Sequence, residues 1–191
     1  MAAPRNDNVK EIILTTTEEL LKEQGVDNIS LANIATACSI SKGTLYYHYK
    51  TKEDIIFDIM DRYLYKQEQD LVVWMDDRSK DTSVNRVLMY VFDRNIHKVG
   101  PRFQLIYSAC YGNDALREKL LARYRKFQNI ISEKLQERDD FTKEMADYVS
   151  WLALLASDGM IIQSELRNEQ FDPEAFIADT ERFFRSLFPT P

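Results

Sequence analysis

Basic and tyrosine-rich side chains are concentrated in one short stretch of the sequence, SLANIATACSISKGTLYYHYKTK, at residues 30–52. Between Thr36 and Lys52 there are three lysines and no carboxylate, although the whole chain carries 31 Asp and Glu against 25 Lys and Arg. Ammonium, hydroxyl and imidazole groups are suited to binding phosphate oxygens. An acidic protein with one such window is expected to bind a polyanion there, and the physically obvious polyanion is a nucleic acid.

Two short helices separated by a turn are predicted to position these side chains. Ser30 suits the N-cap of a helix in which Ile34 and Ala35 face inward, the apolar period breaks at residues 38–40, and Ser41 suits the N-cap of a second helix. In a helix-turn-helix the second helix lies in the major groove of DNA, where its N-terminal side chains reach base edges. The helix that begins at Ser41 is therefore the predicted recognition helix.

The residue types along this helix predict two kinds of DNA contact. Lys42 and Thr44 can reach base edges, because an ammonium pairs with guanine O6 and N7 and a threonine hydroxyl or methyl meets a base edge or a thymine methyl. Gly43 has no side chain, which allows the helix backbone to approach DNA closely. The other polar side chains are predicted to hold phosphates and so to position the protein: Tyr46, Tyr47, His48 and Lys52.

Each of these residues also has a purely structural explanation. Gly43 can be a poor helix former tolerated near a helix start, and His48 taken alone is more often structural than functional. Leu45 and Tyr49 are expected in the core of the small domain, with Tyr46 half in it. The prediction of DNA binding depends on the combination of two capped helices, a turn and a basic surface without acids.

The rest of the sequence predicts an all-α protein of about nine helices. Only five Gly and five Pro occur, and aliphatic residues recur at three- and four-residue spacing. Besides the two short helices, the predicted helices run from a cap at Asn6 or Asp7 to about Gln24, from the Thr51–Asp54 capping box to about Asp76, and over residues 84–99, 102–111, 114–138, 143–166 and 173–188.

Two domains are predicted. Residues 1–52 form a helix-turn-helix DNA-binding domain, and residues 53–191 form a ligand-binding and dimerisation domain. The helix that begins near residue 53 would be long, about 35 Å at 1.5 Å per residue, and would link the two.

The last two helices are predicted to form a homodimer interface. Residues 143–166 are apolar over more than one helical face, and residues 173–188 carry four phenylalanines. Two copies of the pair would make a four-helix bundle. The alternative is that these helices complete a core within one chain.

Other functional classes find little support in the sequence. The two cysteines, Cys38 and Cys110, form neither a disulfide framework nor a zinc motif, and the sequence has no metal-ligand spacing, catalytic triad order or glycine-rich phosphate loop. We therefore expect no metal, no cofactor and no catalytic residue, and do not expect an enzyme. No run approaches the roughly 18 apolar residues of a membrane span, and the N-terminus lacks an apolar signal region, so a cytoplasmic protein is expected.

The window resembles the tetracycline-repressor (TetR) family of bacterial transcription regulators. The resemblance covers roughly residues 9–55 and is carried by Ile34-Ala35, by the run Ser41-Lys42-Gly43-Thr44-Leu45-Tyr46-Tyr47-His48-Tyr49, and by Lys52-Glu53. Position by position, it implies base contacts from Lys42, Thr44 and Tyr47, and phosphate contacts from Ser30, Tyr46, His48 and Lys52. Two positions depart from the family pattern: Ser39 where the turn usually has glycine, and Tyr49 where phenylalanine is common.

The resemblance also implies an effector cavity in the C-terminal domain, which the long helix would couple to the recognition helices. Its candidate lining is aromatic and methionine-rich and suits an apolar or aromatic ligand: Met60, Tyr63, Met89, Phe92, Phe103, Tyr107, Cys110, Tyr111, Trp151 and Leu155. Arg102 or His97 is a candidate polar anchor. The expected function is a repressor that binds a palindromic operator as a dimer and is released by the ligand.

Two alternatives remain open at this point. The chain could be a constitutive DNA-binding or architectural protein without a ligand. It could also be a helical protein-interaction module whose basic window is only a solvated face.

Overall fold

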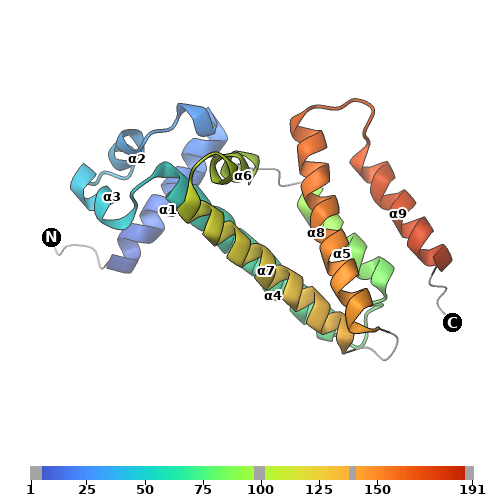
Figure 1. The fold of residues 1–191 in the computed structure, drawn as a ribbon. Helices are drawn as coiled ribbons and strands as arrows, with labels where there is room; N and C mark the ends of the chain where they lie inside the picture. The colour runs from blue at the N-terminus through green and yellow to red at the C-terminus, as the bar shows by residue number, and fades with distance from the viewer. Residues whose placement is uncertain (1–5, 97–101, 138–140, 188–191) are drawn as a thin grey trace. The chain divides into compact units, whose positions relative to one another are not determined.

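Every element in the part of the chain that the computed structural model describes, residues 6–96, 102–137 and 141–187, is helical (Figure 1). The elements are α1 (Asn6–Gln24), the 3-10 turn η1 (Val26–Asn28), α2 (Leu31–Ala37), α3 (Lys42–His48), α4 (Lys52–Asp76), α5 (Val84–Ile96), α6 (Arg102–Cys110), α7 (Asp114–Gln136), α8 (Lys143–Glu165) and α9 (Pro173–Leu187). The predicted all-α class is confirmed. The predicted helix ends at Val99, Arg138 and Phe188 lie outside the described residues.

The chain divides into two compact units. Unit 1 comprises Met1–Leu64 and Gln104–Arg117, and unit 2 comprises Tyr65–Phe103 and Glu118–Pro191. Helices α4, α6 and α7 each contribute residues to both units. The functional boundary expected between residues 52 and 53 stays a prediction.

Unit 1 is built around a small core shared by α1, α2, α3 and the start of α4. Ile13, Ile34, Leu45 and Ile55 are fully buried in it. The predicted end of α1 at Gln24 is confirmed, and Gly25 follows it with φ of 73° and an amide that donates to the Leu21 carbonyl at 3.1 Å. This core fixes the two short helices against α1, so α2 and α3 form the helix-turn-helix that the sequence predicted.

The turn between α2 and α3 contains a residue in the left-handed region. Ser39 has φ of 55°, and the following amide, that of Ile40, donates to the Ala35 carbonyl at 3.0 Å. A non-glycine residue is disfavoured in this conformation by about 1–2 kcal/mol.

We therefore expect Ser39→Gly to stabilise the protein. Relief of the left-handed strain exceeds the loss of about 0.4–1 kcal/mol that comes from the greater freedom of glycine in the unfolded chain. The net gain in unfolding free energy is about 0.5–1 kcal/mol, measured by urea denaturation. Ser39→Ala is the matched control, because it removes the hydroxyl and keeps the strain. Equal stability of the two variants would contradict the strain argument.

Unit 2 has a larger core, in which α5 packs against both α8 and α9. Leu88, Phe92, Ile131 and Leu135 are fully buried there. The second half of α4 is joined to α7 by charge: the buried carboxylate of Glu68 lies 2.7 Å from an Arg123 guanidinium nitrogen and 2.9 Å from Lys126 Nζ. One buried acid thus fixes the register of α7 along α4 within unit 2.

Helix α8 presents two different faces. One face is buried and includes Val149, Ala153 and Met160. The other carries exposed large apolar side chains, of which Tyr148 and Leu155 are the most exposed. No described element covers the second face, so the predicted homodimer interface over residues 143–166 stays a prediction.

By length and composition alone, α8 is also apolar enough to cross a membrane, and it is the one such helix among the described residues. The length of continuous apolar runs in the sequence did not predict this, because polar residues interrupt every such run in α8. However, 44% of its most apolar window is buried inside the protein, as in the core helix of a globular domain.

Candidate nucleic-acid interface

Side-chain capping fixes the start of α3. The hydroxyl of Ser41 accepts a hydrogen bond from the Thr44 amide at 3.0 Å, as the sequence predicted for the N-cap. The Ser41 and Thr44 hydroxyls also share a hydrogen bond of 2.8 Å. The Thr44 hydroxyl is thereby held at the helix start, and a base contact from it would have to share or replace this bond.

The polar side chains of α3 are largely exposed. Tyr47 and Tyr46 are 71% and 47% exposed, and the Tyr47 ring meets the His48 ring edge-on at 5.2 Å between centroids. Lys42 is exposed and has no hydrogen-bond or ion-pair partner within the described part of the chain. Leu45, between them, is completely buried. α3 therefore anchors itself through one apolar residue and leaves its basic and aromatic side chains to solvent.

Gly43 is not required by the packing of unit 1. A Cβ atom at this position would have Ser41 Oγ as its nearest neighbour, at 3.6 Å, which is an ordinary van der Waals distance. Alanine also favours an α-helix over glycine by about 1 kcal/mol. Glycine at position 43 therefore has either a role outside the described fold, such as binding, or no role.

This separates folding from binding in the variant Gly43→Ala. We expect the unfolding free energy to rise by up to about 1 kcal/mol, because helix propensity improves and nothing clashes. DNA affinity should fall at least tenfold, because the added methyl group would lie between the helix backbone and DNA. Thermal melts and fluorescence-anisotropy titrations measure the two effects. Unchanged affinity would leave glycine as a residue merely tolerated near the helix start.

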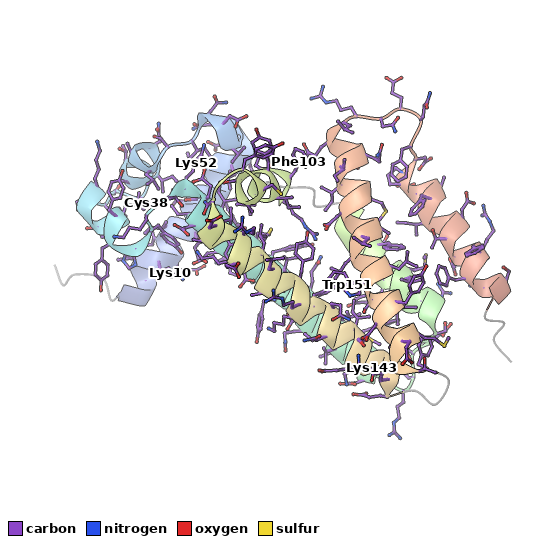
Figure 2. The ribbon with its side chains drawn as sticks, in the orientation of Figure 1. Lys10, Cys38, Lys52, Phe103, Lys143 and Trp151 are labelled. Atoms are coloured by element: carbon purple, nitrogen blue, oxygen red, sulfur yellow. The ribbon has the colours of Figure 1, made fainter. Side chains whose placement is uncertain are left out.

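The other two lysines of the window have partners in the protein. Lys50 Nζ donates to the Tyr46 carbonyl at 2.7 Å. Lys52 Nζ, labelled in Figure 2, donates to the carbonyls of Val26 and Ile29 at 3.0 and 3.3 Å, which ties the start of α4 to η1 and the residue after it. An ammonium group has three N–H donors, so Lys52 retains one that a phosphate can use. The sequence suggested the phosphate role but not the structural one.

Ser30 is the N-cap of α2, as expected, and accepts from the Asn33 amide at 3.2 Å. Beside it, sequence reasoning missed a hollow of about 450 Å³ that the exposed face of α2 forms with the end of α1 and Lys42. Asn33 and Thr36 contribute its polar groups from α2, and no carboxylate lines it. The signal was present in the sequence: polar residues three apart on the outer side of a short helix.

The ten residues expected to line an effector cavity are divided between the two units. Five belong to unit 1 and five to unit 2. Met60, Met89 and Phe92 are buried, whereas Tyr111 is 77% and Leu155 is 65% exposed. The cavity stays a prediction, and His97 lies outside the described residues.

Arg102, the other candidate anchor, belongs to a charged cluster in unit 2 that the sequence did not indicate. Its guanidinium lies 2.7 Å from Asp158 Oδ1, and the Tyr124 hydroxyl donates to Asp158 Oδ2 at 2.6 Å. Burial, reinforced by the Asp158 carboxylate, raises the pKa of Tyr124 to about 12. The hydroxyl is therefore a stable donor that holds the carboxylate at neutral pH.

Unit 2 also contains an apolar groove. It has a volume of about 630 Å³ and is lined by Phe92, Met145, Tyr148, Val149, Leu152, Ala156, Phe176, Asp179, Thr180, Phe183 and Phe184, which come from α5, α8 and α9. The exposed face of α8 continues from it. Figure 1 shows α5, α8 and α9 in this unit, where α5 packs against both of the others, and the exposed Trp151 is labelled in Figure 2.

The capped helix, the left-handed turn and the exposed basic helix α3 define a DNA-binding helix-turn-helix protein. Residues 13–59 match the family model described as bacterial regulatory proteins, tetR family. The HTH-type transcriptional regulator SAB2452 of Staphylococcus aureus (strain bovine RF122 / ET3-1) is 31% identical over 152 residues, which cover 78% of this chain and 79% of that protein. The chain therefore belongs to the TetR family and is a DNA-binding transcriptional regulator.

Solved structures share the fold over nearly the whole chain. FadR of Thermus thermophilus, a TetR family transcriptional repressor in complex with lauroyl-CoA, has a TM-score of 0.68 at 16% identity and covers 95% of this chain and 98% of its own. A protein of Saccharomonospora viridis in complex with choline has a TM-score of 0.65 at 17% identity, with 94% and 96% covered. At these identities the likeness establishes the fold alone.

Proposed function

We propose that the protein is a ligand-responsive repressor that binds a palindromic DNA operator as a homodimer and is released by a small apolar or aromatic effector. The observation that carries the proposed DNA binding is the exposed helix α3. Its first turn contains Lys42, a cation with no partner in the described structure. Lys42, Thr44 and Tyr47 are the proposed base contacts. The proposed backbone contacts are Ser30, Ser41, Gly43, Tyr46, His48 and Lys52.

The dimer is proposed to form through residues 143–166 and 173–188. The exposed apolar side chains of α8 and its C-cap are seven, seven and four residues apart, at Tyr148, Leu155, Ile162 and Leu166, which places them on one face of a helix. Gly159 lies on that face, and a Cβ there would meet nothing within 4 Å of its own chain. A glycine that its own fold does not need, inside an apolar stripe, suits the close approach of a second helix.

Dimerisation matters because one recognition helix binds weakly. The window carries only three lysines, and two recognition helices related by a two-fold axis occupy successive major grooves about 34–36 Å apart. Joining two modest sites in one rigid particle raises overall affinity by about 10²–10⁴. As the proposed dimer interface, α8 and α9 thus contribute to DNA binding.

The effector is proposed to act by favouring a conformer whose recognition helices no longer fit the groove spacing. Support comes from α4, which contributes residues 52–64 to unit 1 and residues 65–76 to unit 2. The ligands named for the two solved structures, lauroyl-CoA and choline, differ in chemistry, so they do not select an effector class for this chain. Coupling of about 1–3 kcal/mol between ligand and operator is typical of such linkage.

A cytoplasmic location and the absence of catalytic activity stay expectations. Both follow from the family, because the relatives that the chain matches are transcriptional regulators, which act on genomic DNA.

Selection of genomic DNA fragments by the purified protein tests the proposal. Recovery of a palindromic site with half-sites one helical turn apart supports operator binding by a dimer. Recovery of no specific sequence, with salt-sensitive binding to all DNA, would favour an architectural protein. No binding to any DNA would favour a helical protein-interaction module and would overturn the proposal.

The ligand switch is tested separately on the operator complex. Calorimetric titration of apolar and aromatic compounds, with and without operator, should give different apparent affinities for an effector. An effector and an operator that bind independently of each other would refute the switch and leave the DNA-binding function in place.

A further inference from the structure

One carboxylate oxygen in unit 1 is shared by two other helical segments. Asp58 Oδ2, on α4, accepts a hydrogen bond from the Tyr49 hydroxyl at 2.9 Å and lies 2.8 Å from Lys10 Nζ on α1. The Lys10 ammonium also lies 5.7 Å from the centroid of the Tyr49 ring. The three groups therefore form one contact that joins α1, α4 and the end of α3 (Lys10 is labelled in Figure 2).

Tyr49 occupies the position that terminates the recognition helix. It is the C-cap of α3, with extended backbone, and its amide donates to the Leu45 carbonyl at 2.9 Å. Its side chain is only 5% exposed, so the ring is core. Phenylalanine would fill the same space. The hydroxyl therefore adds one thing to packing, which is a directional bond from the end of α3 to Asp58.

The electrostatics agree with a persistent bond. Burial, together with the neighbouring Asp58 carboxylate, raises the pKa of Tyr49 well above its usual range, so the hydroxyl keeps its proton. Asp58 gains a cation from Lys10 on the same oxygen. A hydrogen bond to a charged acceptor is stronger than one between neutral groups.

Other contacts hold α4 to α1 but do not reach α3. Arg62 pairs with Glu11 at 2.6 Å and with Glu18 at 3.0 Å. Lys52 bonds to the loop at residues 26–29, as described above. The contact of Asp58 differs from these, because a single carboxylate oxygen joins the end of the recognition helix to both α1 and α4.

We propose that Asp58 is a positioning residue for DNA recognition, which sets the orientation of α3 through the Tyr49 hydroxyl while Lys10 holds the carboxylate in place. This inference rests on the proposed operator binding. Asp58 itself touches no DNA in the proposal. Its loss changes how well α3 fits one sequence, whereas attraction to DNA in general is retained, because that depends on charge.

The test compares specific and non-specific DNA binding by the full-length dimer. Tyr49→Phe should lower affinity for the selected operator at least fivefold and leave affinity for random-sequence DNA at low salt within twofold. Tyr65→Phe is the matched control, because it removes the hydroxyl from a 51% exposed tyrosine of unit 2. The control should change neither affinity.

Asp58→Asn provides the second variant, since it keeps an acceptor for the Tyr49 hydroxyl and loses the charge that pairs with Lys10. Its loss of specific binding should be smaller than that of Tyr49→Phe, and the two substitutions together should cost no more than Tyr49→Phe alone. Equal loss of specific and random binding, or an unchanged ratio in Tyr49→Phe, would overturn the inference. Failure of the wild-type protein to select any operator would instead refute the proposed function.

Discussion

Replacing Leu155 by glutamate is expected to convert the dimer to a monomer and to abolish operator binding at concentrations that saturate the wild-type protein. Leu155 is 65% exposed in a single chain and lies at the middle of the apolar stripe on α8. In a two-fold interface the substitution introduces two buried carboxylates without partners. Each uncompensated buried charge costs several kcal/mol.

The effect on DNA follows from the loss of joint binding. A monomer has one recognition helix, and separation of the two sites removes the gain of about 10²–10⁴ that their linkage supplies. Sedimentation velocity gives the oligomeric state, and anisotropy titration gives operator affinity. Both measurements are needed, because a variant that stays dimeric but binds DNA weakly would show that the substitution acts on DNA binding without breaking the dimer.

Val73→Glu is the matched control for this substitution. Val73 is 71% exposed on α4 in unit 2 and is not one of the proposed interface residues, so the same change of chemistry should leave both dimer and operator affinity unchanged. Because Leu155 is exposed in the chain, the folded monomer should keep its helical circular dichroism. A Leu155→Glu protein that remains dimeric would refute the α8 interface and favour a dimer built elsewhere.

The helices were predictable because their ends depend on local chemistry. Ser30 and Ser41 cap α2 and α3 through neighbours three residues away, and Thr51 and Asp54 bond reciprocally at the start of α4. Such contacts lie within one turn of sequence. The positions of helices therefore followed from the chain with little knowledge of its packing.

The partners of long side chains were not predictable, because they lie far along the chain. Lys52 was assigned to phosphate from its position in a basic window, yet it bonds to carbonyls 26 and 23 residues away. Asp58 was not singled out at all, since a lone acid on an amphipathic helix is usually solvated. The exposed face of α8 shows a related limit: its apolar pattern predicted burial, but periodicity alone does not say whether a second chain or the same chain covers that face.

The second large effect is expected for Lys42→Ala, which should weaken operator binding by about 2–6 kcal/mol. A base contact of this kind contributes about 1–3 kcal/mol of discrimination, and a dimer makes it twice. The fold should not suffer, because Lys42 is exposed and substitutions at such positions change stability by about 0.5 kcal/mol or less. Lys66→Ala, at an exposed lysine of α4 in unit 2, removes the same charge elsewhere and controls for net charge.

The dependence of binding affinity on DNA sequence and on salt concentration shows whether Lys42 contacts a base or a phosphate. If it pairs with a base, Lys42→Ala should lose affinity mainly for the operator, bind DNA altered at one position in each half-site almost as well, and keep the salt slope of the wild type. If it pairs with phosphate, binding should weaken for every sequence, and the slope of log affinity against log salt should fall by about 1 for each lost contact. Affinity equal to that of Lys66→Ala would remove Lys42 from the proposed DNA contacts.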